Sequence, residues 1–237
     1  MFFVYFNGKR DLDLGIKTIK RPSIPIPKKR YKTTTVSGKD GDYYTTNGEY
    51  EDITIPVDFN FIDRTNFHAK CRQIDKWLNK IKDYQLKFSD DLGVFYKVKK
   101  IECDEIERVY KVLGKFTVKF TCDPYAWLVE GQQSITLNGN NIINDFEATK
   151  PIYIINAEGL ITLKVNGKEV TINVGQQVTI NTELQLCFKN KELINLALKT
   201  GKFEDLYLNE GINTIEYSVG TSGTLASIQL IPNWKTL

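Results

Sequence analysis

The chain has 237 residues, of which 41% are hydrophobic, 26% charged and 12% aromatic, a composition typical of folded globular proteins. Its 32 basic and 29 acidic side chains give a net charge of +3, which argues against a protein that binds nucleic acid over its whole surface. The apolar start Met1–Phe6 is too short for a signal-peptide core and no stretch of about 18 apolar residues follows, so the sequence predicts a soluble protein that begins with a strand.

The first unusual segment is residues 20–32, where Pro22, Pro25 and Pro27 alternate with small or apolar residues and lead into the basic run that starts at Lys28. Proline removes a backbone donor and prevents a helix, so this segment is predicted to be extended. Two interpretations are open: a solvated loop, or an arm that leaves its domain and lies against a neighbouring molecule.

A long hairpin and a half-buried strand are predicted next, over residues 35–61. Glycine, aspartate and asparagine mark the turns, and apolar residues then alternate strictly with polar ones at Ile53, Ile55, Val57, Phe59 and Phe61. The exposed hairpin is the second candidate contact surface. Its candidate interface residues are Lys39, Asp40, Asp42, Tyr43 and Tyr44.

The acidic residues of this hairpin resemble a calcium loop only in part. Asp40, Asp42 and Glu51 match the first, third and twelfth positions of an EF-hand loop. Thr45 stands where that loop needs glycine, and Tyr44 stands where it needs an oxygen ligand. No calcium site is therefore expected.

One amphipathic helix is predicted over about residues 64–82, with Asp63 as its N-cap. Its apolar stripe returns every three or four residues and has Trp77 at its margin, so it is expected to pack on a sheet. His68 lies on the flank of the stripe and is expected at the surface. The residues predicted to form the stripe are Phe67, Cys71, Ile74 and Leu78.

Strands resume after the helix and end at Cys122-Asp123-Pro124, where Pro124 is predicted to fix the direction of the chain. Beyond Trp127 the lysine-rich pattern disappears and asparagine and glutamine increase. The sequence therefore predicts an α+β domain over residues 1–130 and an all-β domain over 131–237. A nucleophilic role for Cys122 lacks a neighbouring base, and a buried core thiol is the preferred interpretation.

The second domain is predicted to contain about eight antiparallel strands, arranged as a β-sandwich or jelly roll. Its strongest signal is Asn166-Gly167 between two alternating apolar runs, which predicts a type I′ hairpin.

No catalytic, metal or cofactor site is predicted. The four cysteines have no C-x-x-C spacing, and His68 is the only histidine, so a zinc site lacks ligands. Glu105 with Glu107, or Asp90 with Asp91, could in principle serve a glycosidase, but neighbouring acids are more typical of turns and solvated surfaces. The sequence favours a protein that is not an enzyme.

Four segments, in this order, resemble the distal tail protein family of siphophage-type tails: "VSGKDGDYYTTNGEYEDITIPVDFNF", the helical "IDKWL", "FTVKFTCDPYAW", and "GINTIEYSV" through "IQLIPNWKTL". The resemblance covers nearly the whole chain. It implies an N-terminal domain related to tail-tube proteins and a C-terminal galectin-like or carbohydrate-module-like sandwich.

The same resemblance implies a structural virion protein at the tail tip, made in the cytoplasm of the host bacterium. The implied assembly is a hexameric ring that joins the tail tube protein to the tail-tip hub protein and to receptor-binding proteins. DNA would pass through the ring without sequence-specific binding, and no membrane is involved. The alternative is a carbohydrate-binding module protein that recognises glycans on the host surface.

Overall fold

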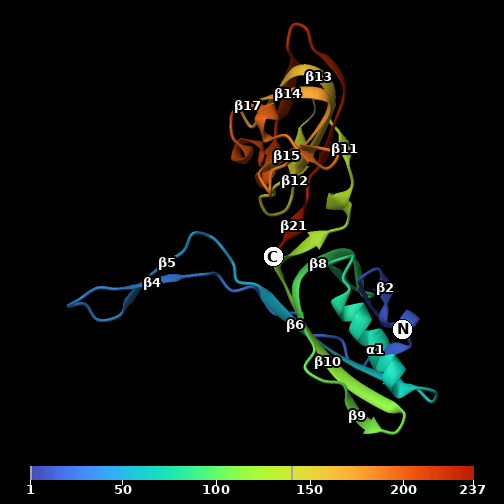
Figure 1. Ribbon diagram of the computed structural model, residues 1–237. Coiled ribbons are helices and arrows are strands. Elements are labelled where there is room, and N and C mark those ends of the chain that lie inside the picture. Colours follow the sequence, from blue (N-terminus) through green and yellow to red (C-terminus); the bar gives the residue numbers. More distant parts are fainter. Residues whose placement is uncertain (1, 140) are drawn as a thin grey trace. The chain divides into compact units, whose positions relative to one another are not determined.

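The computed structural model describes residues 2–139 and 141–237. They form two compact units, one ending at Ala126 but including Leu237, the other Trp127–Thr236, and each has its own core of buried apolar side chains (Figure 1). The prediction of a mostly β chain with one α-helix is confirmed for the described residues. The structure divides the chain slightly before the predicted position of residue 130.

The first unit is built on one antiparallel sheet with the strand order β2-β1-β7-β8-β10-β6-β3, and β9 also pairs with β10. A short 3₁₀ helix, Asp11–Leu14, joins β2 to β3. The strands are β1 (Val4–Phe6), β2 (Lys9–Arg10), β3 (Ile16–Thr18), β6 (Ile53–Ile62), β7 (Gln85–Phe88), β8 (Asp91–Glu102), β9 (Glu107–Tyr110) and β10 (Leu113–Leu128).

The core of this unit follows from the alternation in β6. Every second side chain from Ile53 to Phe61 is buried, and each lies opposite a residue of β10, as Phe59 does with Phe116. These two rings stack at 5.2 Å between centroids. Each fully buried aromatic side chain contributes on the order of 2 kcal/mol through removal of apolar surface from water. The β6–β10 pair therefore forms the centre of the sheet.

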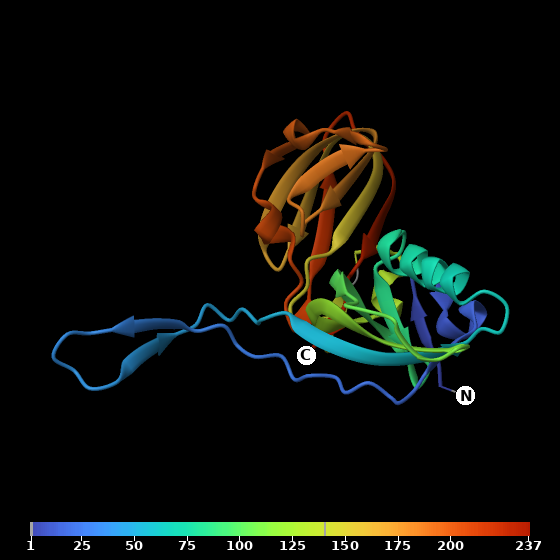
Figure 2. The same cartoon turned by 60° about the horizontal axis from the view of Figure 1, so that its bottom comes forward.

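The single helix, α1 (Phe67–Asn79), lies across one face of the sheet (Figures 1 and 2). Phe67, Ile74 and Leu78 are buried as predicted. Trp77, predicted at the margin of the stripe, is also buried, and its indole Nε1–H donates to the carbonyl of Phe6 at 2.9 Å. This bond satisfies the indole donor inside the core.

Three expectations for the helix need correction. The helix begins at Phe67 rather than near residue 64, and its N-cap is Asn66, whose side chain accepts the backbone N–H of Ala69 at 3.0 Å. Asp63 instead accepts from the backbone N–H groups of Thr65 and Asn66 and so holds the turn before the helix. Cys71 is half-buried and packs against the edge of the core rather than inside it.

The predicted strand end at Cys122-Asp123-Pro124 is wrong. β10 continues through these residues to Leu128, with the Cys122 and Pro124 side chains buried. The turn-forming residues Asp and Pro suggested an end, but the period-two alternation of buried side chains includes Pro124 and the strand continues beyond it. Pro124 is thus part of a strand that leads from one unit into the next.

The second unit contains an eight-stranded sheet with the order β11-β20-β13-β14-β15-β16, to which β17 and β19 add by pairing with β14 and β13. β12 and β18 form a separate two-stranded ribbon. Three short 3₁₀ helices lie at Glu130–Gln132, Asn195–Ala197 and Phe203–Leu206. The strands are β11 (Ile135–Thr136), β12 (Ile142–Asn144), β13 (Ile152–Val165), β14 (Lys168–Asn181), β15 (Leu186–Lys189), β16 (Glu192–Leu193), β17 (Leu198–Thr200), β18 (Gly211–Asn213), β19 (Ile215–Val219), β20 (Thr224–Ile231) and β21 (Lys235–Thr236).

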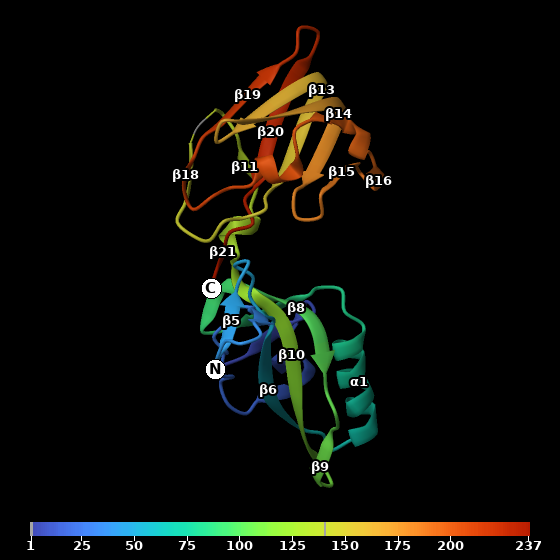
Figure 3. The same cartoon turned by 90° about the vertical axis from the view of Figure 1, so that its left-hand side faces the viewer.

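The hairpin β13–β14 organises this unit (Figure 3). It closes on Asn166 and Gly167 with φ of 51° and 83°, the two positive values that a type I′ turn requires, as predicted. One half of β13 pairs with β20 and the other half with β19, while all its buried side chains point to one side. The sheet therefore curls around its own core.

Local backbone irregularities shape several strands of this unit. β14 continues through Gln176, which adopts a positive φ of 72° without interrupting the pairing. The apolar run from Glu192 to Leu198 breaks into β16, a 3₁₀ turn and β17. Residues 203–206 form a 3₁₀ helix that buries Leu206 in the core.

Within the part of the chain that the structure describes, no helix is long and apolar enough to cross a membrane.

Candidate assembly surface

Residues 20–52 form a single excursion from the first unit, which we call the arm (Figure 2). The proline segment and the hairpin were predicted as separate features, but the structure joins them. β4 (Lys32–Thr35) pairs with β5 (Asp42–Thr45), and below it Lys29 bridges to Tyr50. The basic run after the prolines is therefore one side of the hairpin stem.

The arm is exposed along its length. Every residue from 28 to 49 is exposed, with Ile26 at 88% and Tyr44 at 66%. The β4–β5 hairpin pairs with no other strand of the described chain. A lone two-stranded hairpin is marginal in water, and both its edges offer free backbone groups to a further strand.

Short-range contacts give the hairpin its shape. Tyr31 and Tyr44 meet edge to face at 6.3 Å, and the ammonium of Lys39 lies over the Tyr43 ring and contacts its hydroxyl. The Asp42 carboxylate accepts the Thr35 hydroxyl at 2.8 Å across the strands, so it is engaged in pairing. Asp40 and Asp42 belong to no group of three or more metal-binding side chains among residues 2–139 and 141–237.

The arm is fixed where it returns to the sheet. Lys99 on β8 donates to Asp52 at 2.6 Å and to Asp123 at 2.9 Å. Burial lowers the pKa of Lys99, but the hydrogen bonds to Asp52 and Asp123 outweigh it, and the net pKa lies above the usual value. Tyr50 meets Tyr125 edge to face at 6.1 Å beside this cluster.

The departing end of the arm is also held. The backbone N–H of Ile19 donates to the carbonyl of Asp58 at 2.8 Å, and Lys20 pairs with the Asp58 carboxylate at 3.3 Å. Arg21 pairs with Asp90 at 3.2 Å. These contacts at both ends were not predicted, because they join residues far apart in the sequence and follow no periodic pattern.

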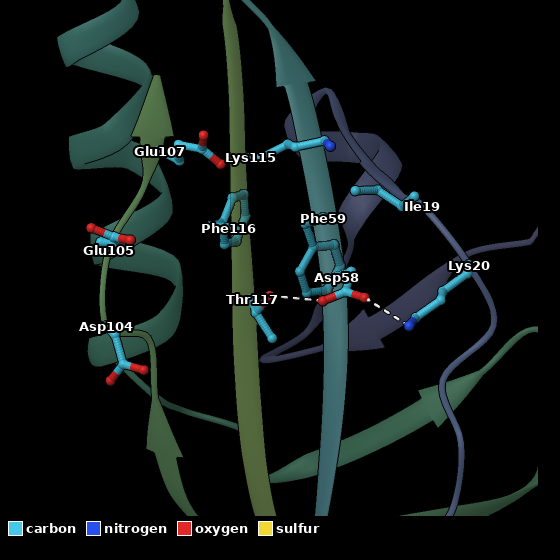
Figure 4. A pocket seen from close by; sticks show the side chains of 10 residues that line it. All are labelled: Ile19, Lys20, Asp58, Phe59, Asp104, Glu105, Glu107, Lys115, Phe116 and Thr117. Atoms are coloured by element: carbon cyan, nitrogen blue, oxygen red, sulfur yellow. Dashed lines mark hydrogen bonds and ion pairs between the residues drawn. The ribbon is translucent and has the colours of Figure 1, made fainter. Parts of the chain in front are cut away.

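Asp58 lies in a depression of about 560 Å³ on the sheet face opposite the helix (Figure 4). The Thr117 hydroxyl donates to this carboxylate at 2.7 Å, and that bond, followed by the contact with Lys20, lowers the pKa of Asp58. Glu105 and Glu107 line the opposite rim and are exposed.

The four cysteines, His68 and the candidate interface residues were also singled out in the sequence. Cys122 and Cys187 are buried thiols, Cys71 and Cys103 are half-buried, and all four are free. His68 is exposed, and its ring is perpendicular to that of Phe67 at 5.8 Å between centroids. The structure brings all nine candidate interface residues onto the arm: Pro22, Pro25, Pro27, Lys28, Lys39, Asp40, Asp42, Tyr43 and Tyr44.

Comparison with known proteins gives two matches. Residues 12–122 match the model of the phage tail protein RIFT-related domain. The whole chain also matches the crystal structure of the SPP1 Dit protein (gp 19.1), described as a paradigm of the hub adsorption apparatus in phages that infect Gram-positive bacteria. That match covers 100% of this chain and 98% of the other, with a TM-score of 0.62 and 16% sequence identity. Residues 12–122 are therefore similar to phage tail proteins, and the fold of the whole chain is similar to that of SPP1 Dit.

The predicted resemblance is thereby confirmed, and a structural role in the phage tail follows from it. The matched residues 12–122 include the whole arm and the strands β6 and β8, which contact it. The comparison with curated proteins gives no significant match.

Proposed function

We propose that this distal tail protein forms a closed ring, and that the arm of each copy lies on the next copy. The observation that carries the proposal is the arm itself: a hairpin exposed from residue 28 to 49, unpaired at both edges, and fixed at both ends. A head-to-tail contact between identical subunits covers such an edge. The assembly closes into a ring when the rotation from one subunit to the next is an integer fraction of a full turn.

The family supplies the finer expectations. The ring is a hexamer at the distal end of the tail, between the tail tube protein and the hub protein, with receptor-binding proteins as further partners. DNA passes through its opening without sequence-specific contacts, and the protein has no enzymatic activity. The first unit is expected to be related to tail-tube proteins and the second to be galectin-like. Synthesis takes place in the host cytoplasm, and assembly leads to the virion tail tip.

The test removes the arm without touching the sheet. Because Lys29 and Tyr50 are bridge partners, residues 30–49 can be replaced by two glycines across a short gap. All the removed residues are exposed, so the thermal unfolding of the remaining protein should change little. Native mass spectrometry should show six copies for the full chain, alone or with the tube and hub proteins, and monomers for the shortened one.

A matched pair of substitutions refines this test. Tyr44→Ala on the hairpin should weaken assembly, whereas Tyr110→Ala on β9 should not, although the two side chains are similarly exposed at 66% and 69%. A full chain that stays monomeric with both partner proteins present, or a shortened chain that still forms the same ring, would contradict the proposal.

A further inference from the structure

A groove lies between α1 and the segment 103–106, which joins β8 to β9. Its volume is about 490 Å³, within the range of pockets that enclose a small ligand or a few residues of a peptide. Apolar side chains, buried or half-buried, form its floor, and a partner that covers them removes apolar surface from water. The floor residues are Ile74, Leu78, Ile101, Cys103 and Ile106.

The charged side chains that line this groove are all negative. They are Asp75, Glu102, Asp104 and Glu105, and no lysine or arginine is among the described residues that line it. Burial first, and then the carboxylates of Asp104 and Asp75, raise the pKa of the Cys103 thiol, so both walls contribute negative potential at the floor. The groove therefore suits a ligand that joins an apolar side chain to positive charge.

The base of the arm offers that combination. Ile26 stands between two prolines and is 88% exposed, more than any other large hydrophobic side chain that the structure describes. Lys28 and Lys29 follow, both exposed, and neither ammonium group forms an ion pair within residues 2–139 and 141–237. Because proline restricts φ, this segment is already extended before it binds and loses little conformational entropy.

Two of the four groove carboxylates, those of Asp75 and Glu105, also form no ion pair with a cation of the described chain. We propose that the groove receives residues 25–29 of the next copy in the ring, with Ile26 on the apolar floor and the two lysines beside these carboxylates. The inference rests on the ring proposed above and names the surface that receives the arm.

The arm of the same chain cannot fill the groove. Ile24 lines a small hollow with Phe88 and Tyr96. Glu102, at the groove, is six residues beyond Tyr96 on β8, a separation of about 20 Å along the strand. Ile26 is only two residues past Ile24 and lies at most about 7 Å farther on, so it falls short of the groove. The groove and the arm base are thus separate surfaces of one subunit, and a contact between them is head to tail, as a ring requires.

Charge reversal tests this pairing in the full-length protein. Lys28→Glu with Lys29→Glu, and separately Asp75→Lys with Glu105→Lys, should each raise the protein concentration needed for ring formation at least tenfold, as measured by native mass spectrometry. All four changes in one chain should restore assembly to within about threefold of the original, because every copy then carries both reversed surfaces.

Two controls separate loss of the contact from misfolding. All four reversed side chains are exposed, so the thermal unfolding of the variants should change little. Glu192→Lys with Glu210→Lys reverses two exposed carboxylates of the second unit and should leave assembly unchanged.

Cys103 on the groove floor gives a second measurement. Chains with both Ile26→Cys and Cys103→Ala are produced together with tagged chains of the original sequence, and the assembled rings are oxidised at pH 9, where thiolates form. A disulfide should then join one chain type to the other, and it should be absent when the tagged chain also carries Cys103→Ala. Ile143→Cys, at an exposed position of the second unit, replaces Ile26→Cys as the matched control and should give no cross-link to Cys103.

The outcomes distinguish this inference from the ring itself. Rings that survive both charge reversals, or a fourfold variant that assembles no better than either pair, overturn the inference and leave the proposed ring unaffected. A cross-link that is absent from assembled rings, or that persists without Cys103, does the same. Loss of hub or tube binding with the ring intact would assign the groove to that protein instead. A full chain that stays monomeric with both partner proteins present overturns the ring and this inference with it.

Discussion

At the scale of single residues, Cys122 shows how burial controls a thiol. Its side chain is fully buried next to β6, and its S–H lies 3.6 Å from the carbonyl of Phe120. Burial first, and then the carboxylates of Asp123 and Asp52, raise the pKa of this thiol to about 12. A thiol that stays protonated is inert as a nucleophile, so Cys122 acts as a small apolar core residue.

The first prediction is that Cys122→Ala lowers the free energy of unfolding by about 1–2 kcal/mol at pH 7, the usual cost of a small core cavity. The loss should shrink at alkaline pH. In the unfolded chain the thiol titrates near pH 9, so its contribution to stability is complete below pH 9 and is lost progressively towards pH 12. Urea unfolding of both proteins between pH 7 and 10.5 measures this. If the difference in unfolding free energy between the two proteins stays constant or grows over that pH range, the interpretation of Cys122 as a buried, protonated thiol is contradicted.

At the scale of elements, two polar residues near the start of α1 have different structural roles. Asn66 caps the helix by accepting the N–H of Ala69, and Asp63 holds the preceding turn through Thr65 and Asn66. Those hydrogen bonds, from the Asn66 backbone first, lower the pKa of Asp63. The helix begins where a side chain satisfies its first free N–H groups.

The second prediction follows from this cap. Asn66→Ala should cost about 1 kcal/mol of stability, because one N–H at the start of α1 loses its partner. Asn79→Ala is the matched control: it is an exposed asparagine at the other end of the same helix, bonded only to the Asp75 side chain at 2.6 Å. Chemical unfolding should place the control within about 0.5 kcal/mol of the original protein. Equal losses for the two variants would mean that Asn66 is not the cap.

At the scale of the whole molecule, the second unit begins earlier than the change in composition suggests. Trp127 is buried, the N–H of Leu128 donates to the carbonyl of Trp234 at 2.9 Å, and the N–H of Asn233 donates to the carbonyl of Gly131 at 2.8 Å. A Cβ on Gly131 would come within 2.5 Å of the Trp234 nitrogen, so the two segments approach as closely as backbones can. Residues 127–131 therefore belong to this unit.

The third prediction is that residues 127–236, produced alone, fold into a monomeric β domain with a cooperative thermal transition. A fragment starting at residue 135 lacks the two backbone bonds to Trp234 and Asn233 and should unfold at a temperature several degrees lower. Circular dichroism melts of the two fragments make the comparison. Identical melting temperatures would show that residues 127–134 only connect the units, and an unfolded longer fragment would show that the units are not independent.

Features with a regular period could be predicted from the sequence, and features set by distant contacts could not. The alternation from Ile53 to Phe61 fixes β6, and Asn166-Gly167 fixes the hairpin turn, because each depends on neighbouring residues alone. The 3₁₀ helix at Phe203–Leu206 buries Leu206 in the core, where its carbonyl accepts the hydroxyl of Tyr153, a contact between residues far apart in the sequence.

The same distinction holds for the candidate assembly surface. Prolines and turn residues indicated an extended, exposed segment, and the structure places all of them on the arm. The cluster of Asp52, Lys99 and Asp123 joins three separate strands or their ends and leaves no local signal.

The hairpin β13–β14 also bears on how the chain is made. Its 14 paired residues on each strand join through a two-residue turn, so it can form within microseconds once Asn181 is available, before any later segment exists. Its buried side, however, needs β20, which ends at Ile231. While the 50 residues from 182 to 231 are being synthesised, the apolar side of the completed hairpin therefore remains exposed. In that interval a nascent chain of this protein depends most on a chaperone.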